Sequence, residues 1–236
     1  MITSPSPSES TTEKPPFFVA LDVPTTQQAL DLVAQLKPYV GGFKVGLELF
    51  CSTGPQIVEQ IGAREIFLDL KFHDIPNTVR GASLGAAKLG VKIFNVHCLG
   101  GFDMMRAAAD AAHEAGTGSK VIGVTVLTSH DRPSLARLGL DEEPQSAVRR
   151  LARLAQEAGL DGVVCSAQEI EAVRAECGPD FVLVTPGIRP AGAALGDQKR
   201  VMTPREAIEA GATWLVVGRP ITAAPNPAEV ARTLFD

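Results

Sequence analysis

The sequence lacks the marks of several protein classes. Its four cysteines form no CxxC pair, so a zinc site is not expected. No apolar run approaches the roughly 18 residues of a membrane span, and the N-terminus has no basic-then-apolar signal pattern. A net charge of −5 argues against a uniformly basic face for nucleic acid, although it permits a local anion pocket. These absences predict a soluble cytoplasmic protein with no membrane or nucleic-acid partner.

The length suits one large domain. The chain has 236 residues, of which 45% are hydrophobic, and a single α/β barrel commonly has this size. Residues 1–15 are rich in serine, threonine and proline and contain almost no apolar side chains. Such a segment cannot bury enough surface to offset its ordering entropy. We therefore predict a disordered tail over residues 1–15 and one folded domain over residues 16–236.

Short apolar runs alternate with longer amphipathic stretches along the rest of the chain. Eight β-then-α units imply eight parallel strands, which close naturally into a (β/α)8 TIM barrel. An open doubly wound sheet is the alternative, but it normally needs a glycine-rich turn after the first strand, and Asp22-Val23-Pro24 is no such turn. The expected strands cover 17–21, 42–45, 66–70, 93–96, 121–127, 162–164, 181–184 and 214–217, and helices are expected over stretches such as 81–89, 104–115, 147–158 and 204–210.

Polar residues follow nearly every predicted strand. In a barrel the carboxyl-terminal ends of all strands lie on one face, where active sites form. Solvation alone makes strand ends polar, but it does not favour single residues placed one per strand over a mixed turn composition. The pattern therefore favours a functional face, built from Asp22, Lys44, Asp69 with Lys71, His97, Thr128, Ser166, Thr185 and Arg219.

Residues 69–78, with the sequence DLKFHDIPNT, carry the most informative motif. On a strand, alternation points Asp69 and Lys71 to the same face. Asp74 follows in the turn before a helix that Pro76 begins. We interpret the three charges as a catalytic row. The alternative is a buried salt-bridge network that orders the barrel rim, although burying three charges for stability alone is seldom favourable.

The last two predicted strands are followed by features of a phosphate site. Gly218 allows the backbone to approach a ligand, and Arg219 can form bidentate hydrogen bonds with phosphate oxygens. Strand seven leads to Arg189 and then to a small-residue loop over residues 190–196, which suits a lid. Barrels often bind phosphate at this position. A phosphorylated substrate is therefore expected, with solvated surface arginines as the alternative.

The motifs from Phe17 to the C-terminus together resemble those of bacterial orotidine 5′-phosphate decarboxylases. The resemblance implies decarboxylation of orotidine 5′-phosphate to uridine 5′-phosphate (UMP) and CO2, the last step of UMP biosynthesis, with no cofactor and no metal. It also implies a homodimer in which Asp74 and Thr78 reach the neighbouring site. The matching motifs are Ala20-Leu21-Asp22, Phe43-Lys44-Val45-Gly46, Asp69-x-Lys71-x-x-Asp74-Ile75-Pro76-Asn77-Thr78, Val126-Leu127-Thr128-Ser129, Thr185-Pro186-Gly187-Ile188-Arg189, Asp197-Gln198 and Val217-Gly218-Arg219-Pro220.

The same resemblance implies roles for individual residues. Lys71 would donate a proton to the C6 carbanion, with Asp69, Asp74 and Lys44 as its charged partners. The substrate-binding residues would be Asp22 and Lys44 at the ribose, Thr128 at the pyrimidine, Asp69 and Thr78 within the motif, and Arg189, Gln198, Gly218 and Arg219 at the phosphate and lid.

Two other functions fit parts of the pattern. A Mg²⁺-dependent sugar-phosphate decarboxylase or aldolase of the same barrel superfamily shares the Asp-x-Lys-x-x-Asp motif. Such relatives carry a glutamate in place of Lys44, whose ammonium would repel a divalent ion. A non-catalytic nucleotide-binding barrel would be expected to lose a charge of the row, and none is lost. No pair of histidines has metal-ligand spacing; His97, at the end of strand four, is expected to support the charged row by hydrogen bonding.

Overall fold

Eight short, β-rich apolar runs pair side by side as parallel strands and close into a barrel. The computed structural model describes residues 14–189 and 202–236. Each strand pairs with the next along the chain, and β8 pairs with β1 to close the sheet. The strands are β1 (Phe17–Ala20), β2 (Gly42–Gly46), β3 (Ile66–Phe72), β4 (Ile93–His97), β5 (Lys120–Val124), β6 (Gly162–Val164), β7 (Val182–Pro186) and β8 (Trp214–Val217).

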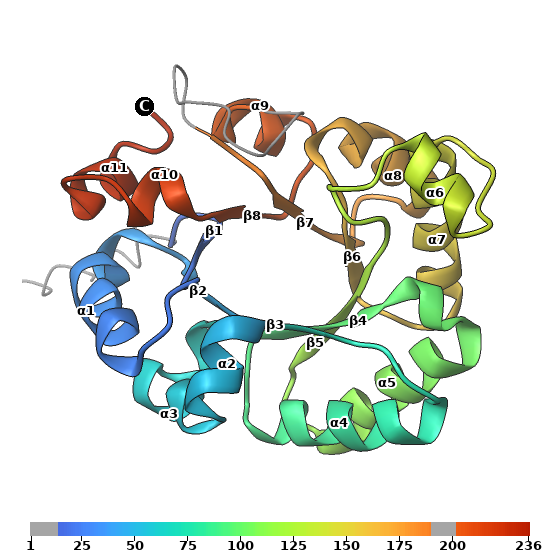
Figure 1. Ribbon diagram of the computed structural model, residues 1–236, viewed down its shortest axis with the longest axis horizontal. Coiled ribbons are helices and arrows are strands. Elements are labelled where there is room, and N and C mark those ends of the chain that lie inside the picture. Colours follow the sequence, from blue (N-terminus) through green and yellow to red (C-terminus); the bar gives the residue numbers. More distant parts are fainter. Residues whose placement is uncertain (1–13, 190–201) are drawn as a thin grey trace, which may run out of the picture.

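Helices surround the barrel as a ring (Figure 1). α11 packs against α1, so the last helix closes the ring beside the first. Proline occupies the first turn of α4, α7 and α9, where its missing N–H is not needed. The helices are α1 (Thr26–Leu36), α2 (Leu47–Thr53), α3 (Gln56–Ile61), α4 (Pro76–Lys88), α5 (Phe102–Ala115), α6 (Arg132–Arg137), α7 (Pro144–Glu157), α8 (Ile170–Cys177), α9 (Pro204–Glu209), α10 (Arg219–Thr222) and α11 (Pro227–Arg232).

Side-chain alternation divides the core into an inner and an outer part. Along β1, Phe18 and Ala20 belong to the inner cluster, whereas Phe17 and Val19 belong to the outer cluster that also contains helix residues. The barrel is therefore a packed core and not a pore. The inner cluster consists of Phe18, Ala20, Phe67, Ile93, Ile122, Val182, Val184 and Val216.

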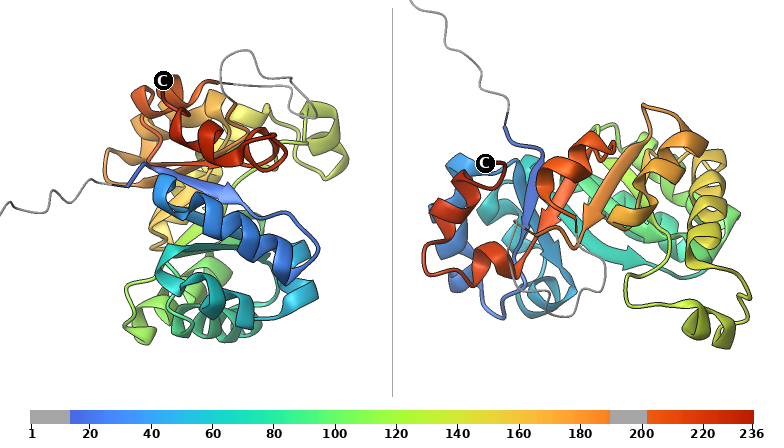
Figure 2. Two further views of the ribbon diagram at one scale, coloured as in Figure 1. Left: turned by 90° about the vertical axis from the view of Figure 1, so that its left-hand side faces the viewer. Right: turned by 90° about the horizontal axis from the view of Figure 1, so that it is seen from above.

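The structure confirms the predicted barrel and its alternation of strands and helices. The largest difference in a strand boundary is at β5, which ends at Val124 and not at residue 127, whereas the other strand ends lie within two residues of those predicted. The apolar run continues because Val126 packs against the core from the connection that follows the strand. Helix α4 begins at Pro76, as the motif predicted. The segment that carries α6, after β5, projects beyond the neighbouring helices (Figure 2).

Two predicted segments fall largely outside the described residues. The described chain starts at Lys14, so the tail expected over residues 1–15 is covered only at its end, and the loop 190–196 is not covered. Lys14 Nζ lies 2.6 Å from Glu65 Oε1, and the Pro16 carbonyl accepts a hydrogen bond from the Leu215 N–H. Within the described ranges, no helix is long and apolar enough to cross a membrane.

Candidate active site

The end of β3 departs from a regular strand. Its register with β4 shifts between Leu68 and Phe72, and Lys71 has a φ of 52°, the only positive value among described residues other than glycine. A lysine rarely adopts this left-handed conformation, so its surroundings must hold it there. The side chains of Asp69 and Lys71 are in contact, as expected for two residues on the same face: Lys71 Nζ lies 2.7 Å from Asp69 Oδ1. Regular alternation is not the whole cause, since the irregular register also re-aims the lysine.

Four side chains form a row of alternating charge at the ends of the first three strands. Lys44 Nζ lies 2.9 Å from Asp22 Oδ1 and 3.4 Å from Asp69 Oδ2, so this charged row runs Asp22, Lys44, Asp69, Lys71. Gly46 leaves the space for it, since a Cβ there would lie 2.9 Å from Lys44 Nζ. The side chain of Lys44 is 11% exposed and that of Lys71 is 31% exposed. Lys71 is therefore the more exposed of the two ammonium groups.

The neighbours of Asp69 keep its carboxyl group charged. Burial by itself raises the pKa of this group, but the ammonium groups of Lys44 and Lys71 and the hydrogen bonds from Lys71 and Asn95 outweigh burial. They hold the pKa of Asp69 below its usual value. The carboxylate in turn attracts both ammonium groups and fixes their positions.

Asn95 joins the charged row from β4, although it was not among the expected site residues. Its side chain is fully buried, and Nδ2 donates to Asp69 Oδ1 at 2.7 Å. Its Oδ1 accepts the N–H of Lys71 at 2.8 Å. The sequence did contain a signal, because an amide inside the apolar run Ile93-Phe94-Asn95-Val96 needs polar partners within the barrel.

Three expected site residues lie apart from the charged row. Asp74 is exposed in the turn before α4, where its Oδ1 accepts the N–H of Ile75 at 2.7 Å. Thr78 is exposed in the first turn of α4, and Thr128 is exposed in the turn that follows β5. Among the described residues, no hydrogen bond or ion pair joins Asp74, Thr78 or Thr128 to Lys71.

His97 differs from its expected role. Its Nδ1 accepts the N–H of Leu99 at 3.4 Å, and the hydrogen bond to the charged row comes instead from Asn95. The ring of His97 stacks on that of His73, with the centroids 5.3 Å apart. Burial, together with His73, Lys71 and His130, lowers the pKa of His97 to about 4. The ring is therefore neutral near pH 7 and flanks the row without extending it.

A pocket of about 200 Å³ connects the Asp22 and Lys44 end of the charged row to the ends of the last two strands. Arg189 is only 9% exposed, so its guanidinium is held inside the molecule and not on the surface. The residues expected to hold ribose and those expected to hold phosphate therefore share one cavity. Gln198 lies outside the described residues. The lining includes Asp22, Lys44, Arg189, Gly218 and Arg219.

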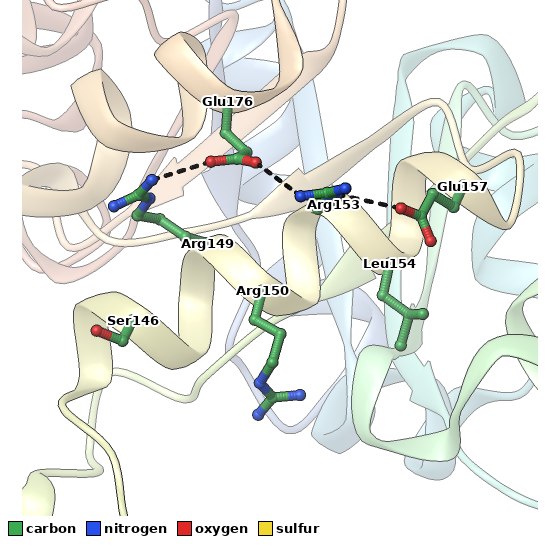
Figure 3. Close-up of a pocket in the computed structure, with 7 residues that line it drawn as sticks. All are labelled: Ser146, Arg149, Arg150, Arg153, Leu154, Glu157 and Glu176. Atoms are coloured by element: carbon green, nitrogen blue, oxygen red, sulfur yellow. Dashed lines mark hydrogen bonds and ion pairs between the residues drawn. The ribbon is translucent and has the colours of Figure 1, made fainter.

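A larger cavity of about 590 Å³ lies on α7 and α8, not at the strand ends. Its three arginines are already paired: Arg149 and Arg153 contact Glu176, and Arg153 also contacts Glu157 (Figure 3). Arg150 contacts Glu142. Exposed pairs of this kind contribute little and offer no excess charge to a ligand. The smaller pocket beside the charged row is therefore the candidate active site.

The chain closely matches proteins of one family. The family model described as "Orotidine 5'-phosphate decarboxylase / HUMPS family" matches residues 15–234. A Nitrosococcus oceani protein named orotidine 5′-phosphate decarboxylase is 54% identical over 224 residues, covering 94% of this chain and 97% of that protein. A Moorella thermoacetica protein of the same name is 52% identical, with coverages of 94% and 91%. The crystal structure of orotidine 5′-phosphate decarboxylase from Lactobacillus acidophilus has a TM-score of 0.81 and 38% identity, and the match covers 93% of this chain and 96% of that one.

Proposed function

The chain belongs to the orotidine 5′-phosphate decarboxylase / HUMPS family, and on this premise we propose that it converts orotidine 5′-phosphate to UMP and CO2. The observation that carries this choice is the charged row, whose Asp22 and Lys44 line a pocket that also contains Arg189 and Arg219. Loss of CO2 from C6 of the pyrimidine leaves an electron pair in the plane of the ring. Because the ring carbonyls cannot delocalise that pair, catalysis must come from charges placed around C6.

Lys71 is the proposed proton donor. As the bond between C6 and the carboxylate breaks, its ammonium stabilises the electron pair left on C6. The ammonium then transfers a proton to that carbon, and the resulting amine regains a proton from water. At about 4 Å and an effective dielectric of about 20, one such charge pair contributes about 4 kcal/mol. The total barrier reduction in enzymes is commonly several times larger, so other groups must share the work.

The rest of the charged row orients Lys71 and the ribose. Asp69 holds the ammonium at 2.7 Å and so limits the positions that it can adopt. Lys44 compensates the charge of Asp69, and together with Asp22 it supplies polar contacts for the ribose hydroxyls. Family resemblance assigns Thr128 to the pyrimidine.

The phosphate end of the pocket supplies binding energy far from the bond that breaks. Arg189 and Arg219, with the backbone at Gly218, are proposed to grip the phosphate, and Gln198 is proposed to contact it from the loop. Binding at a remote group can offset the cost of bringing the substrate carboxylate next to Asp69. That cost explains why a decarboxylase would bind a phosphate that takes no part in the reaction.

A homodimer is proposed to complete the site. Large apolar side chains are exposed after three successive strands: Leu47 (53%) after β2, Ile75 (67%) after β3, and Leu99 (41%) and Phe102 (40%) after β4. Apolar groups clustered at one rim favour burial against a partner, and a second copy in two-fold symmetry is the simplest partner. Asp74 and Thr78 are exposed beside Ile75. Burying this rim would carry both side chains toward the partner's Lys71.

The proposed reaction is tested by following orotate absorbance with orotidine 5′-phosphate and EDTA present. We expect full activity in EDTA, because no step uses a divalent ion. Activity that returns only with Mg²⁺ would indicate a metal-dependent sugar-phosphate type of chemistry and a different role for Lys44. Absence of turnover in any buffer, with binding of UMP retained, would indicate a nucleotide-binding barrel.

The shared site is tested by mixing two inactive chains. Lys71→Ala and Asp74→Ala each remove one component, but a hybrid dimer has one site that retains both. We expect the mixture to recover about a quarter of the native activity, because random exchange makes half of the dimers hybrid and each hybrid holds one intact site of two. A lack of recovery, after mass spectrometry has confirmed that subunits exchange, would contradict the shared site.

A further inference from the structure

We infer that Asn95 is a positioning residue for the decarboxylation, because one amide fixes both the Asp69 carboxylate and the backbone of Lys71. The inference rests on the proposed function, since the groups that Asn95 orients are the proposed proton donor and its partner. Asn95 is on β4, outside the motif that contains Lys71, and its side chain is fully buried and so does not touch substrate.

The two hydrogen bonds of Asn95 use both ends of its amide. Nδ2 donates to Asp69 Oδ1 at 2.7 Å, and that same oxygen lies 2.7 Å from Lys71 Nζ. Oδ1 accepts the Lys71 N–H at 2.8 Å. The amide, the carboxylate and the lysine therefore form a closed set of contacts, in which the side chain and the backbone of Lys71 are both tied to Asn95. Only a side chain with a donor and an acceptor on one planar group can make this pair of bonds.

The backbone bond matters because β3 is irregular at this point. In a regular parallel ladder a strand N–H bonds to a carbonyl of the neighbouring strand. The register shift between Leu68 and Phe72 breaks that pattern, and the Asn95 side chain supplies the acceptor for Lys71. A buried N–H that loses its acceptor is costly, and so is a lysine held at a φ of 52°. Without the amide we expect Lys71 to relax toward negative φ, which moves Nζ away from Asp69.

Asn95→Leu tests this role, because leucine has a similar size but makes neither hydrogen bond. A displacement of the ammonium by about 1 Å can lower a rate by about a hundredfold. We therefore expect kcat per folded subunit to fall about a hundredfold, while KM for orotidine 5′-phosphate changes less than about threefold because the phosphate contacts of the pocket are intact.

Asn95→Asp makes the pH dependence of kcat a test, because a purely structural role of Asn95 would not change it. A protonated carboxyl group at this position can donate to Asp69 and accept from Lys71, whereas an ionised one cannot donate and repels Asp69. Burial and the Asp69 carboxylate raise the pKa of the new group, against the opposing effect of the ammonium groups of Lys44 and Lys71. We therefore expect the ratio of the kcat of Asn95→Asp to that of the native enzyme to rise as the pH falls. The same ratio for Asn95→Leu should stay flat.

Ser119→Ala is the matched control. Ser119 is also buried, and its Oγ donates to the Val91 carbonyl at 2.6 Å just before β5, at the opposite end of the barrel from the charged row. This control should lower the melting temperature and leave kcat per folded subunit unchanged. If Asn95→Leu behaves in the same way, the positioning role is overturned while the decarboxylase function stands. If the native chain does not turn over orotidine 5′-phosphate, the proposed function fails, and with it the reaction that Asn95 would serve.

Discussion

Replacing Lys71 with alanine is expected to lower kcat for orotidine 5′-phosphate by about 10⁵-fold while the protein stays folded. The loss has two parts. Removing a cation about 4 Å from the developing charge costs about 4 kcal/mol at an effective dielectric of about 20, which corresponds to about a thousandfold. Losing the proton donor costs about a hundredfold more. The measurement is the initial rate from orotate absorbance, with circular dichroism to determine the folded fraction.

Lys71→Arg separates the charge of Lys71 from its proton. Arginine keeps a cation near C6 but does not release a proton at accessible pH. We therefore expect its kcat to lie above that of the alanine variant and still about a hundredfold below native. Lys120→Ala is the control, because Lys120 also pairs with an aspartate, at 3.3 Å from Asp161 Oδ1, but is half exposed on the surface. An alanine variant of Lys71 that retains more than about a tenth of the native kcat would contradict its role as proton donor.

The fold was predictable because local patterns and the barrel topology agree. Each apolar run pairs with the next, so the order of strands follows from the order of runs in the chain. Pro76 marked the start of α4 because proline is compatible with a first helical turn and with few other helix positions. The end of β5 was less predictable. Val126 is apolar and packs against the core, and burial alone does not distinguish a strand residue from one in the following connection.

The candidate site was predictable to the extent that it depends on strand ends. Asp22, Lys44 and Arg219 come together because parallel strands place their carboxyl ends on one face. The conformation of Lys71 and its bond to Asn95 were not predictable, because both depend on the register between β3 and β4, which local sequence does not determine.

Arg219→Ala is expected to lower kcat/KM for orotidine 5′-phosphate by about 10²- to 10³-fold. A guanidinium that grips phosphate oxygens in a partly buried pocket forms charge-assisted hydrogen bonds, and truncating such a group commonly costs about 2–5 kcal/mol. Arg189, which is buried in the same pocket, remains and limits the loss. Arg232→Ala is the control, because Arg232 pairs with Glu229 on α11 and should leave kcat/KM unchanged.

The phosphate-free nucleoside orotidine shows whether Arg219 acts through the phosphate. The native enzyme should turn over orotidine far more slowly than the nucleotide, because the remote binding energy that offsets the crowding of Asp69 and the substrate carboxylate is missing. Arg219→Ala should slow the nucleotide strongly and the nucleoside very little, since orotidine has no phosphate to lose. An equal loss of rate on the nucleotide and the nucleoside would mean that Arg219 supports the local structure at the end of β8 and does not act on the phosphate. Equal native rates on both substrates would mean that the phosphate does not contribute to catalysis, and the function assigned to this end of the pocket would be wrong.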